Sequence, residues 1–227
     1  MTCQNPIETR IRDPRVLRPP PPEPDVETLD DTRLLGRLLR PLSGGADGLA
    51  ARLLVRFGSH GDLVSADPAA LKRALSGGSQ GVALLALVRE LAIRLARDSA
   101  RRRRDITSAT ELGAYVRIMM AHRPREQFRV LFLDNRNRLM RDEMVAEGTV
   151  DHAPVYPREV MRRALELSAS SMILVHNHPA GDPTPSRADI DMTARVVEAA
   201  RCLGLLVHDH LVVAREGTCS FRALGLM

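Results

Sequence analysis

Aromatic residues are scarce in this chain of 227 residues, since they make up only 3% of the sequence and tryptophan is absent. A surface that binds nucleic acid by stacking bases on aromatic rings is therefore not expected. The volume of the core must come from aliphatic side chains, and 44% of the sequence is hydrophobic. The length allows two domains of moderate size.

Cysteine is also scarce, and the three cysteines, Cys3, Cys202 and Cys219, include no closely spaced pair. A disulfide framework and a zinc site made of thiolates are therefore not expected, and a reducing compartment fits best. No stretch approaches the roughly 18 uninterrupted apolar residues of a membrane span, and the N-terminus lacks the apolar run of a signal peptide. We expect a soluble cytoplasmic protein that does not contact membranes.

Positive charge is in excess, with a formal net charge of +5 and a pI near 9.8. This balance allows contact with nucleic acid or an acidic partner, but the arginines are scattered, so charge alone does not predict a dedicated nucleic-acid surface. The arginine run at residues 101–104 is better explained as a solvated helix end and linker than as a phosphate contact.

The first half of the chain reads as a tail followed by a helical domain. Residues 1–26 contain four consecutive prolines and predict a disordered tail. Residues 27–100 carry leucines at helical spacing and predict four helices, of which the second ends at Gly58. The fourth is long and follows a glycine-rich hinge at residues 77–81. Its apolar residues are expected to be Leu84, Leu87, Leu91 and Leu95.

The second half, residues 106–227, alternates between helical and strand patterns. A capping-box sequence at Ser108 introduces a helix to about His122, and Phe128 to Val145 reads as a hairpin. Further on, the expected elements are a helix around residues 158–167, a strand at 172–175, a helix at 186–202 and strands at 205–214 and 220–224. This alternation predicts a mixed α/β layer structure with a central sheet.

One motif carries metal chemistry. His176 and His178 are separated by one residue in an expected strand, so both imidazoles project to the same side. A loop rich in proline and glycine follows, and Asp189 lies in the first turn of the next helix. Two neutral nitrogens and one carboxylate suit zinc, and three protein ligands leave a fourth position for water. The sequence therefore predicts one zinc ion per chain.

Simpler explanations exist for each part of this motif. Ser186 and Asp189 have the spacing of a helix capping box, and two histidines at a strand end can be structural. A capping box, however, explains neither the histidines nor the enclosing loop. The His-Asn-His nuclease motif is set aside, because its residues are spread over a longer unit whereas residues 176–178 are contiguous.

The string from His176 to Asp189 resembles the JAMM metallopeptidase signature, and its surroundings resemble the bacterial RadC proteins. The matching segments are residues 130–137 (VLFLDNRN), 148–150 (GTV), 157–160 (PREV) and 208–211 (HDHL), within about residues 107–227. This resemblance implies a JAB1/MPN-type α-β-α domain with a mixed central sheet. It also implies zinc held by His176, His178 and Asp189, and a Ser186 hydroxyl that helps to hold the tetrahedral intermediate.

The family's general base is a glutamate just upstream of the first sheet strand. Glu126 occupies that place in this chain, while Glu143 and Glu147 are alternatives on or near the second strand, and all three could instead be solvated surface carboxylates. His208 and His210 are expected on one face of a strand, in supporting or structural roles, because a site closed by further ligands would have no place for water.

The N-terminal helices resemble a helix-hairpin-helix domain, with one departure. The glycine turn at residues 77–81 is followed by apolar residues 82–85, so the basic residue that would reinforce a phosphate contact is missing. DNA contact through this domain is therefore only weakly supported.

The leading hypothesis is a zinc-dependent hydrolase that cleaves a peptide or isopeptide bond with Glu126 as general base. The alternative, suggested by the family's DNA-repair label, is an accessory protein whose metal site is not catalytic. A phosphodiesterase is less favoured, since one metal without clustered basic residues stabilises a phosphorane poorly. The sequence names neither a particular substrate nor an oligomeric state.

Overall fold

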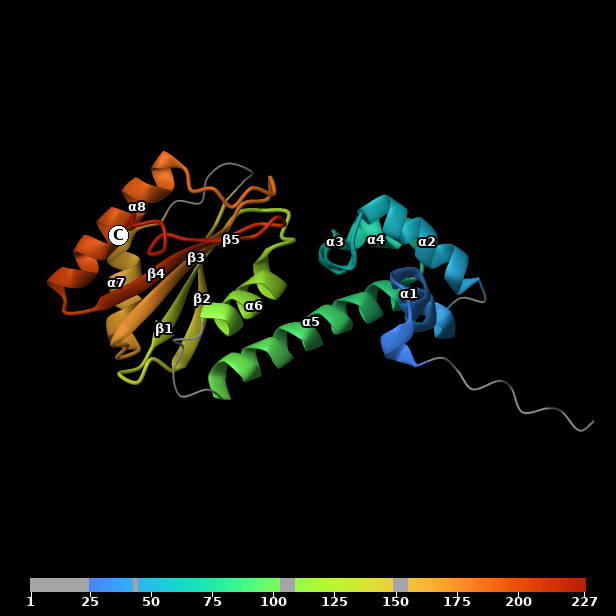
Figure 1. The fold of residues 1–227 in the computed structure, drawn as a ribbon, viewed down its shortest axis with the longest axis horizontal. Coiled ribbons are helices and arrows are strands. Elements are labelled where there is room, and N and C mark those ends of the chain that lie inside the picture. Colours follow the sequence, from blue (N-terminus) through green and yellow to red (C-terminus); the bar gives the residue numbers. More distant parts are fainter. Residues whose placement is uncertain (1–24, 43–44, 103–108, 149–154) are drawn as a thin grey trace, which may run out of the picture.

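A computed structural model describes residues 25–42, 45–102, 109–148 and 155–227. The short helices α1 to α4 gather at one end of the molecule, a sheet with its own helices forms the other, and the long helix α5 joins them (Figure 1). Almost all of the tail predicted for residues 1–26, the capping residue Ser108 and most of the 148–150 segment lie outside the described residues.

The N-terminal unit consists of short helices whose ends follow local sequence signals. The side chains of Asp30, Ser59 and Asp67 accept hydrogen bonds from backbone N–H groups at three helix starts. Gly58 ends the second helix with φ of 89°, a conformation that favours glycine. The helices are α1 (Asp31–Leu39), α2 (Ala46–Phe57), α3 (His60–Ser65), α4 (Pro68–Ala74) and α5 (Ser79–Arg102), with 3₁₀ turns at Val26–Thr28 and Arg40–Leu42.

The prediction of four helices was wrong, because α3 was missed. This helix has six residues, of which only Leu63 is buried, so it has too few turns to display a helical period. The predicted stop at Gly58 is confirmed.

The C-terminal unit is a five-stranded mixed sheet, as predicted. The strand order is β2-β1-β3-β4-β5, in which β3 and β4 are parallel and all other neighbours are antiparallel. The elements are α6 (Ala109–Met120), β1 (Gln127–Leu133), β2 (Leu139–Glu147), α7 (Pro157–Glu166), β3 (Ser171–Asn177), α8 (Arg187–Cys202), β4 (Leu206–Val213) and β5 (Thr218–Ser220). The last strand was predicted at residues 220–224, but the chain turns there, since Leu226 N–H donates to the carbonyl of Phe221.

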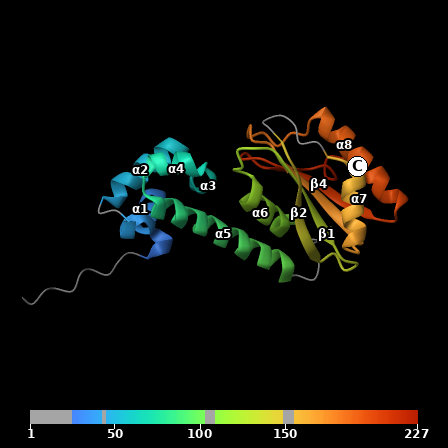
Figure 2. The ribbon, with the colours of Figure 1, turned by 180° about the vertical axis from the view of Figure 1, so that it is seen from behind.

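Helices cover both faces of the sheet (Figures 1 and 2). Along β1, Phe128, Val130 and Phe132 pack with α7 and α8, whereas Leu131 and Leu133 pack with α6. This alternation of apolar side chains is the period of a strand that is buried on both sides.

Helix α5 contributes to both hydrophobic cores. Its Leu85 is buried among the N-terminal helices, and its Ile93 is buried with α6 and the sheet. The predicted long helix is confirmed, although Leu87, Leu91 and Leu95, which mark it in the sequence, are 67%, 59% and 62% exposed. A helix that packs against two cores buries a different side in each. A single stripe of apolar residues at helical spacing therefore does not predict which of its side chains are buried.

Among the described residues, no helix has the length and the apolar character that crossing a bilayer requires.

Candidate metal centre

The end of β3 and the start of α8 bring the predicted ligands together. Nε2 of His176 and Nε2 of His178 lie 2.9 Å apart, and they lie 3.3 and 3.5 Å from the carboxylate oxygens of Asp189. One ligand atom from each residue falls within 4.8 Å of the others, so the group could hold a metal ion. The His176 side chain is 1% exposed, while His178 and Asp189 retain some access to solvent at 20% and 14%.

A chain of hydrogen bonds fixes which nitrogen of His176 carries its proton. The hydroxyl of Thr193 donates to the backbone carbonyl of Asp189 at 2.6 Å, so its oxygen must accept from Nδ1 of His210, also at 2.6 Å. Nε2 of His210 then accepts from Nδ1 of His176 at 2.8 Å. We assign the tautomers from this network. Nε2 of His176 is therefore left with a lone pair.

His178 reaches the same state by a different route. Its Nδ1 donates to the backbone carbonyl of Asp182 at 2.9 Å, and a carbonyl can only accept. Its Nε2 lone pair therefore points toward Nε2 of His176 and the carboxylate of Asp189. Three electron-rich atoms at such short separations repel one another unless a cation or a shared proton lies between them.

The electrostatics of the group fit this description. Burial would raise the pKa of Asp189, but when a proton takes the place of a cation, the protonated imidazoles of His176 and His178 donate to Asp189; with the Ser186 hydroxyl they outweigh burial and hold that pKa well below its usual value. The hydrogen bond to Asp189 raises the pKa of His178. The carboxylate is thus an anion that binds cations strongly.

Asp189 belongs to the metal group and to a capping box at the same time. The backbone N–H and the hydroxyl of Ser186 both donate to the carboxylate of Asp189, at 2.7 and 2.6 Å, and Asp189 N–H approaches the Ser186 oxygen at 3.2 Å. The two explanations of the Ser186-x-x-Asp189 spacing are therefore compatible. Ser186 touches the predicted ligand directly and restricts its rotation.

Asn177, between the two histidines, connects strands β3 and β1 beside the candidate site, which the sequence did not reveal. Its side chain is fully buried on the opposite side of β3, where its oxygen accepts from Gln127 N–H at 2.9 Å. Its amide nitrogen donates to the carbonyls of Arg123 and Arg125, at 3.5 and 3.1 Å. These bonds fix the backbone on both sides of Glu126 to the strand that carries the histidines.

The three candidate bases differ in surroundings. Glu126 precedes β1, is half-buried, and its charge helps to raise the pKa of His178. Glu143 is paired with Arg163 at 2.6 Å, and this hydrogen bond holds the pKa of Glu143 below its usual value, which suits a base poorly. Glu147 lies beside the amide of Gln127 at 3.5 Å. Of these three, the charge of Glu126 acts on the predicted ligand His178.

His208 and His210 do not share one environment, contrary to prediction. The register between β3 and β4 shifts between Met172 and Ile173, where β4 carries one extra residue, and this irregularity breaks the alternation at His208. His208 bonds to Asn137 at 2.7 Å, while His210 is fully buried against His176 and stacks on Phe221. Burial lowers the pKa of His210 well below its usual value, so it is neutral.

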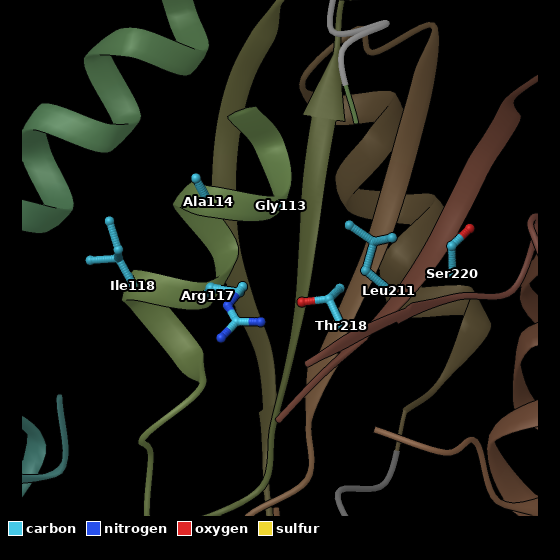
Figure 3. Close-up of a pocket in the computed structure, with 7 residues that line it drawn as sticks. All are labelled: Gly113, Ala114, Arg117, Ile118, Leu211, Thr218 and Ser220. Carbon is cyan, nitrogen blue, oxygen red and sulfur yellow. The ribbon is translucent and has the colours of Figure 1, made fainter. Parts of the chain in front are cut away.

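A groove of about 640 Å³ lies elsewhere, between α6 and the strands β4 and β5 (Figure 3). Its wall residue Leu211 packs on the α6 side of the sheet, whereas His176 stacks with Phe128 on the α7 and α8 side. The groove and the metal group therefore occupy opposite faces. It is lined by Gly113, Ala114, Arg117, Ile118, Leu211, Thr218 and Ser220.

Comparison with known proteins adds two findings. A family model described as a RadC-like JAB domain matches residues 106–226. A UPF0758 protein of Rhodobacter capsulatus is 55% identical over 179 residues, which cover 79% of this chain and 84% of that protein.

Proposed function

This chain belongs to the family of proteins with a RadC-like JAB domain, and on that premise we propose that it is a zinc-dependent hydrolase of the JAMM type. The bond cleaved is an amide, in a peptide or an isopeptide. We place the activity in the cytoplasm, because the two described cysteines, Cys202 and Cys219, are free thiols.

One observation carries the proposal: the lone pairs of two imidazole nitrogens and a low-pKa carboxylate meet at one point. A neutral imidazole carries one N–H proton. In both histidines that proton is on Nδ1, where it is donated in a hydrogen bond, so neither Nε2 has a proton to share with the atoms that face it. Two nitrogen ligands and one carboxylate are the donor set that catalytic zinc takes in other hydrolases. His176, His178 and Asp189 would hold the ion.

The bound ion would supply Lewis acidity, which activates a water molecule and polarises a carbonyl group. Glu126 accepts a proton from the attacking water as its oxygen bonds to the carbonyl carbon, and passes the proton to the nitrogen as the C–N bond breaks. The Ser186 hydroxyl, which donates to Asp189 in the free protein, would turn its proton to the developing oxyanion once the ion satisfies that carboxylate. Asn177 keeps Glu126 in register with the histidines.

Elemental analysis of the purified protein tests the metal site. We expect about one zinc ion per chain in the wild type, as for a mononuclear catalytic site, and its loss in His178→Ala and Asp189→Ala. The matched control is Asp191→Ala, an exposed aspartate two residues along α8 that pairs with Arg187, and it should keep its zinc. A wild-type protein that stays metal-free after zinc reconstitution would contradict the proposal.

Turnover distinguishes the hydrolase from the alternative, an accessory protein whose metal site is not catalytic. On a panel of peptides and isopeptides, Glu126→Gln should keep its zinc and lose activity by about 10²- to 10⁴-fold. Glu143→Gln is the control and should retain activity. Equal rates in Glu126→Gln and wild type would remove Glu126 from the mechanism, and a zinc-loaded wild type without turnover on the panel would favour the accessory role.

A further inference from the structure

Two arginines meet at the boundary between the helical unit and the sheet unit. Arg89, on α5, donates from one terminal nitrogen to the carbonyl of Met119 at 3.1 Å and from Nε to Ser65 at 3.2 Å. Arg123, just after α6, donates from Nε to the same carbonyl at 3.3 Å. Within the described ranges, neither guanidinium forms an ion pair with a carboxylate, and most of their N–H groups have no protein acceptor.

This arrangement is electrostatically unfavourable. Both side chains are half-buried, and two like charges converge on one carbonyl oxygen. Burial and the charge of Arg123 lower the pKa of Arg89 to about 10, and burial also lowers the pKa of Arg123. The charge of Glu90 attracts both arginines and that of Glu147 attracts Arg123, but these attractions do not outweigh the loss of hydration on burial. An anion between them would relieve the repulsion.

There is room for such an anion. A cavity of about 360 Å³ is lined by Arg89, Arg123 and Arg125. Two carboxylates also line it, but Asp67 is occupied as the N-cap of α4 and Glu147 lies beside the amide of Gln127. The walls that belong to α3, α4 and α5 include Val64, Ser65, Pro68, Leu71, Val82 and Ala86.

We propose that this cavity binds a phosphate group, held by the guanidinium groups of Arg89 and Arg123 with Arg125 at its exposed side. Guanidinium forks match phosphate oxygens with paired hydrogen bonds. A phosphate offers more acceptor oxygens than a carboxylate, which suits the several N–H donors that remain. The phosphate belongs either to a small phosphorylated compound or to a nucleic-acid backbone.

The cavity is separate from the metal group but is joined to it by the backbone. The carbonyls of Arg123 and Arg125 accept from the side chain of Asn177, which lies between His176 and His178. Arg89 reaches across to Ser65 at the end of α3. A bound phosphate would therefore link the helical unit to the segment that carries Glu126.

Calorimetric titration of the full chain with inorganic phosphate, and separately with a short single-stranded oligonucleotide, tests the proposal. We expect phosphate to bind the wild type, with affinity reduced about tenfold or more in Arg123→Gln and in Arg89→Gln. Arg201→Gln, at an exposed position near the end of α8, is the control and should bind like the wild type. Chelator-treated protein should bind phosphate equally, so a failure of the metal proposal leaves this test intact.

The two ligands separate the possible sources of the phosphate. An oligonucleotide that binds more tightly than free phosphate, with the same loss in Arg123→Gln, assigns a nucleic-acid backbone; comparable affinities assign a small phosphorylated compound. Arg123→Gln removes only one bond within its own helix end and should keep the wild-type melting temperature. Absence of phosphate binding in the wild type, or equal binding by Arg123→Gln and wild type, overturns the proposal.

Discussion

At the scale of single residues, Thr193 has the most consequence for the proposed zinc site without being a predicted ligand. Its hydroxyl is the pivot of the hydrogen-bond chain that leaves Nε2 of His176 unprotonated. Thr193→Val keeps the shape of the side chain but removes the hydroxyl that accepts from Nδ1 of His210. His210 can then carry its proton on Nε2, facing His176. We expect zinc affinity to fall about 10- to 100-fold, as measured by competition with a chromophoric chelator.

The control for that experiment is Thr218→Val, on the exposed edge strand β5, which should bind zinc like the wild type. A Thr193→Val protein that melts normally and binds zinc with unchanged affinity would show that the tautomer of His176 is not set through His210. A cobalt-loaded sample adds a second measurement, since a changed ligand arrangement alters the absorption spectrum of the ion.

The sequence predicted which three side chains meet, because their spacing alone places them at a strand end and a helix start. It could not reveal the residues that orient them. Asn177 acts on Gln127, fifty residues away in the chain, and Thr193 acts on His210, seventeen residues away. Such pairs exist only after the sheet and α8 have packed, and neither residue has a distinctive local pattern.

At the scale of secondary-structure elements, α3 contacts the start of the C-terminal unit very closely. A Cβ atom added at Gly61 would lie 2.3 to 2.8 Å from three atoms of the His122 ring. Gly61→Ala should therefore push α3 away from the end of α6 and destabilise the protein by about 1–3 kcal/mol. Urea denaturation measures the change.

Gly113→Ala on α6 is a matched comparison, since a Cβ there meets nothing within 4 Å. Alanine is the better helix former, so this substitution should raise stability by up to about 1 kcal/mol. If both substitutions shift stability equally and in the same direction, the close contact between Gly61 and His122 does not restrain α3.

The same helix carries an acid-sensitive contact. Burial would raise the pKa of Asp62, but hydrogen bonds from His122 and Ser59, with the charges of His122 and Arg215, hold that pKa below its usual value. Arg215 in turn donates to the carbonyl of Pro179, next to His178. A carboxyl whose pKa is lowered in the folded state stabilises that state above its unfolded pKa.

Asp62→Asn should therefore be less stable than the wild type at neutral pH. The difference should begin to shrink below pH about 3.9, the ordinary value for aspartate, and should vanish below the lowered pKa of the folded state. Denaturant melts at several pH values measure it. A difference that stays constant down to strongly acidic pH would mean that the ionised carboxylate of Asp62 does not contribute.

Elements were predicted well where one periodic face meets one core. The hairpin of β1 and β2 and the strand β3 are of this kind, since long apolar or alternating runs specify them. The errors fell on α3, with one buried residue, and on the last strand, which ends at Ser220 instead of running from 220 to 224. In both cases tertiary packing determined the local structure, and the local sequence pattern did not predict it.

At the scale of the whole molecule, α5 contributes to the cores of both units. A fragment of residues 106–227 covers the family's domain but lacks Ile93, so the core beside α6 loses its cover. We expect this fragment to be less stable than residues 79–227, by about 2–5 kcal/mol if the loss resembles truncation of a buried isoleucine. Thermal melts and size-exclusion chromatography compare the two. Equal melting temperatures would mean that the domain ends where the family model begins.

A shared helix also determines how the molecule carries a load. Twenty-four helical residues form a strut about 36 Å long, anchored at Leu85 in one core and at Ile93 in the other. Tension applied to the N-terminal helices therefore reaches the sheet unit through the packed side chain of Ile93. In single-molecule pulling, the helical unit should not detach at a low force of its own, and the first rupture should already involve the core beneath α6.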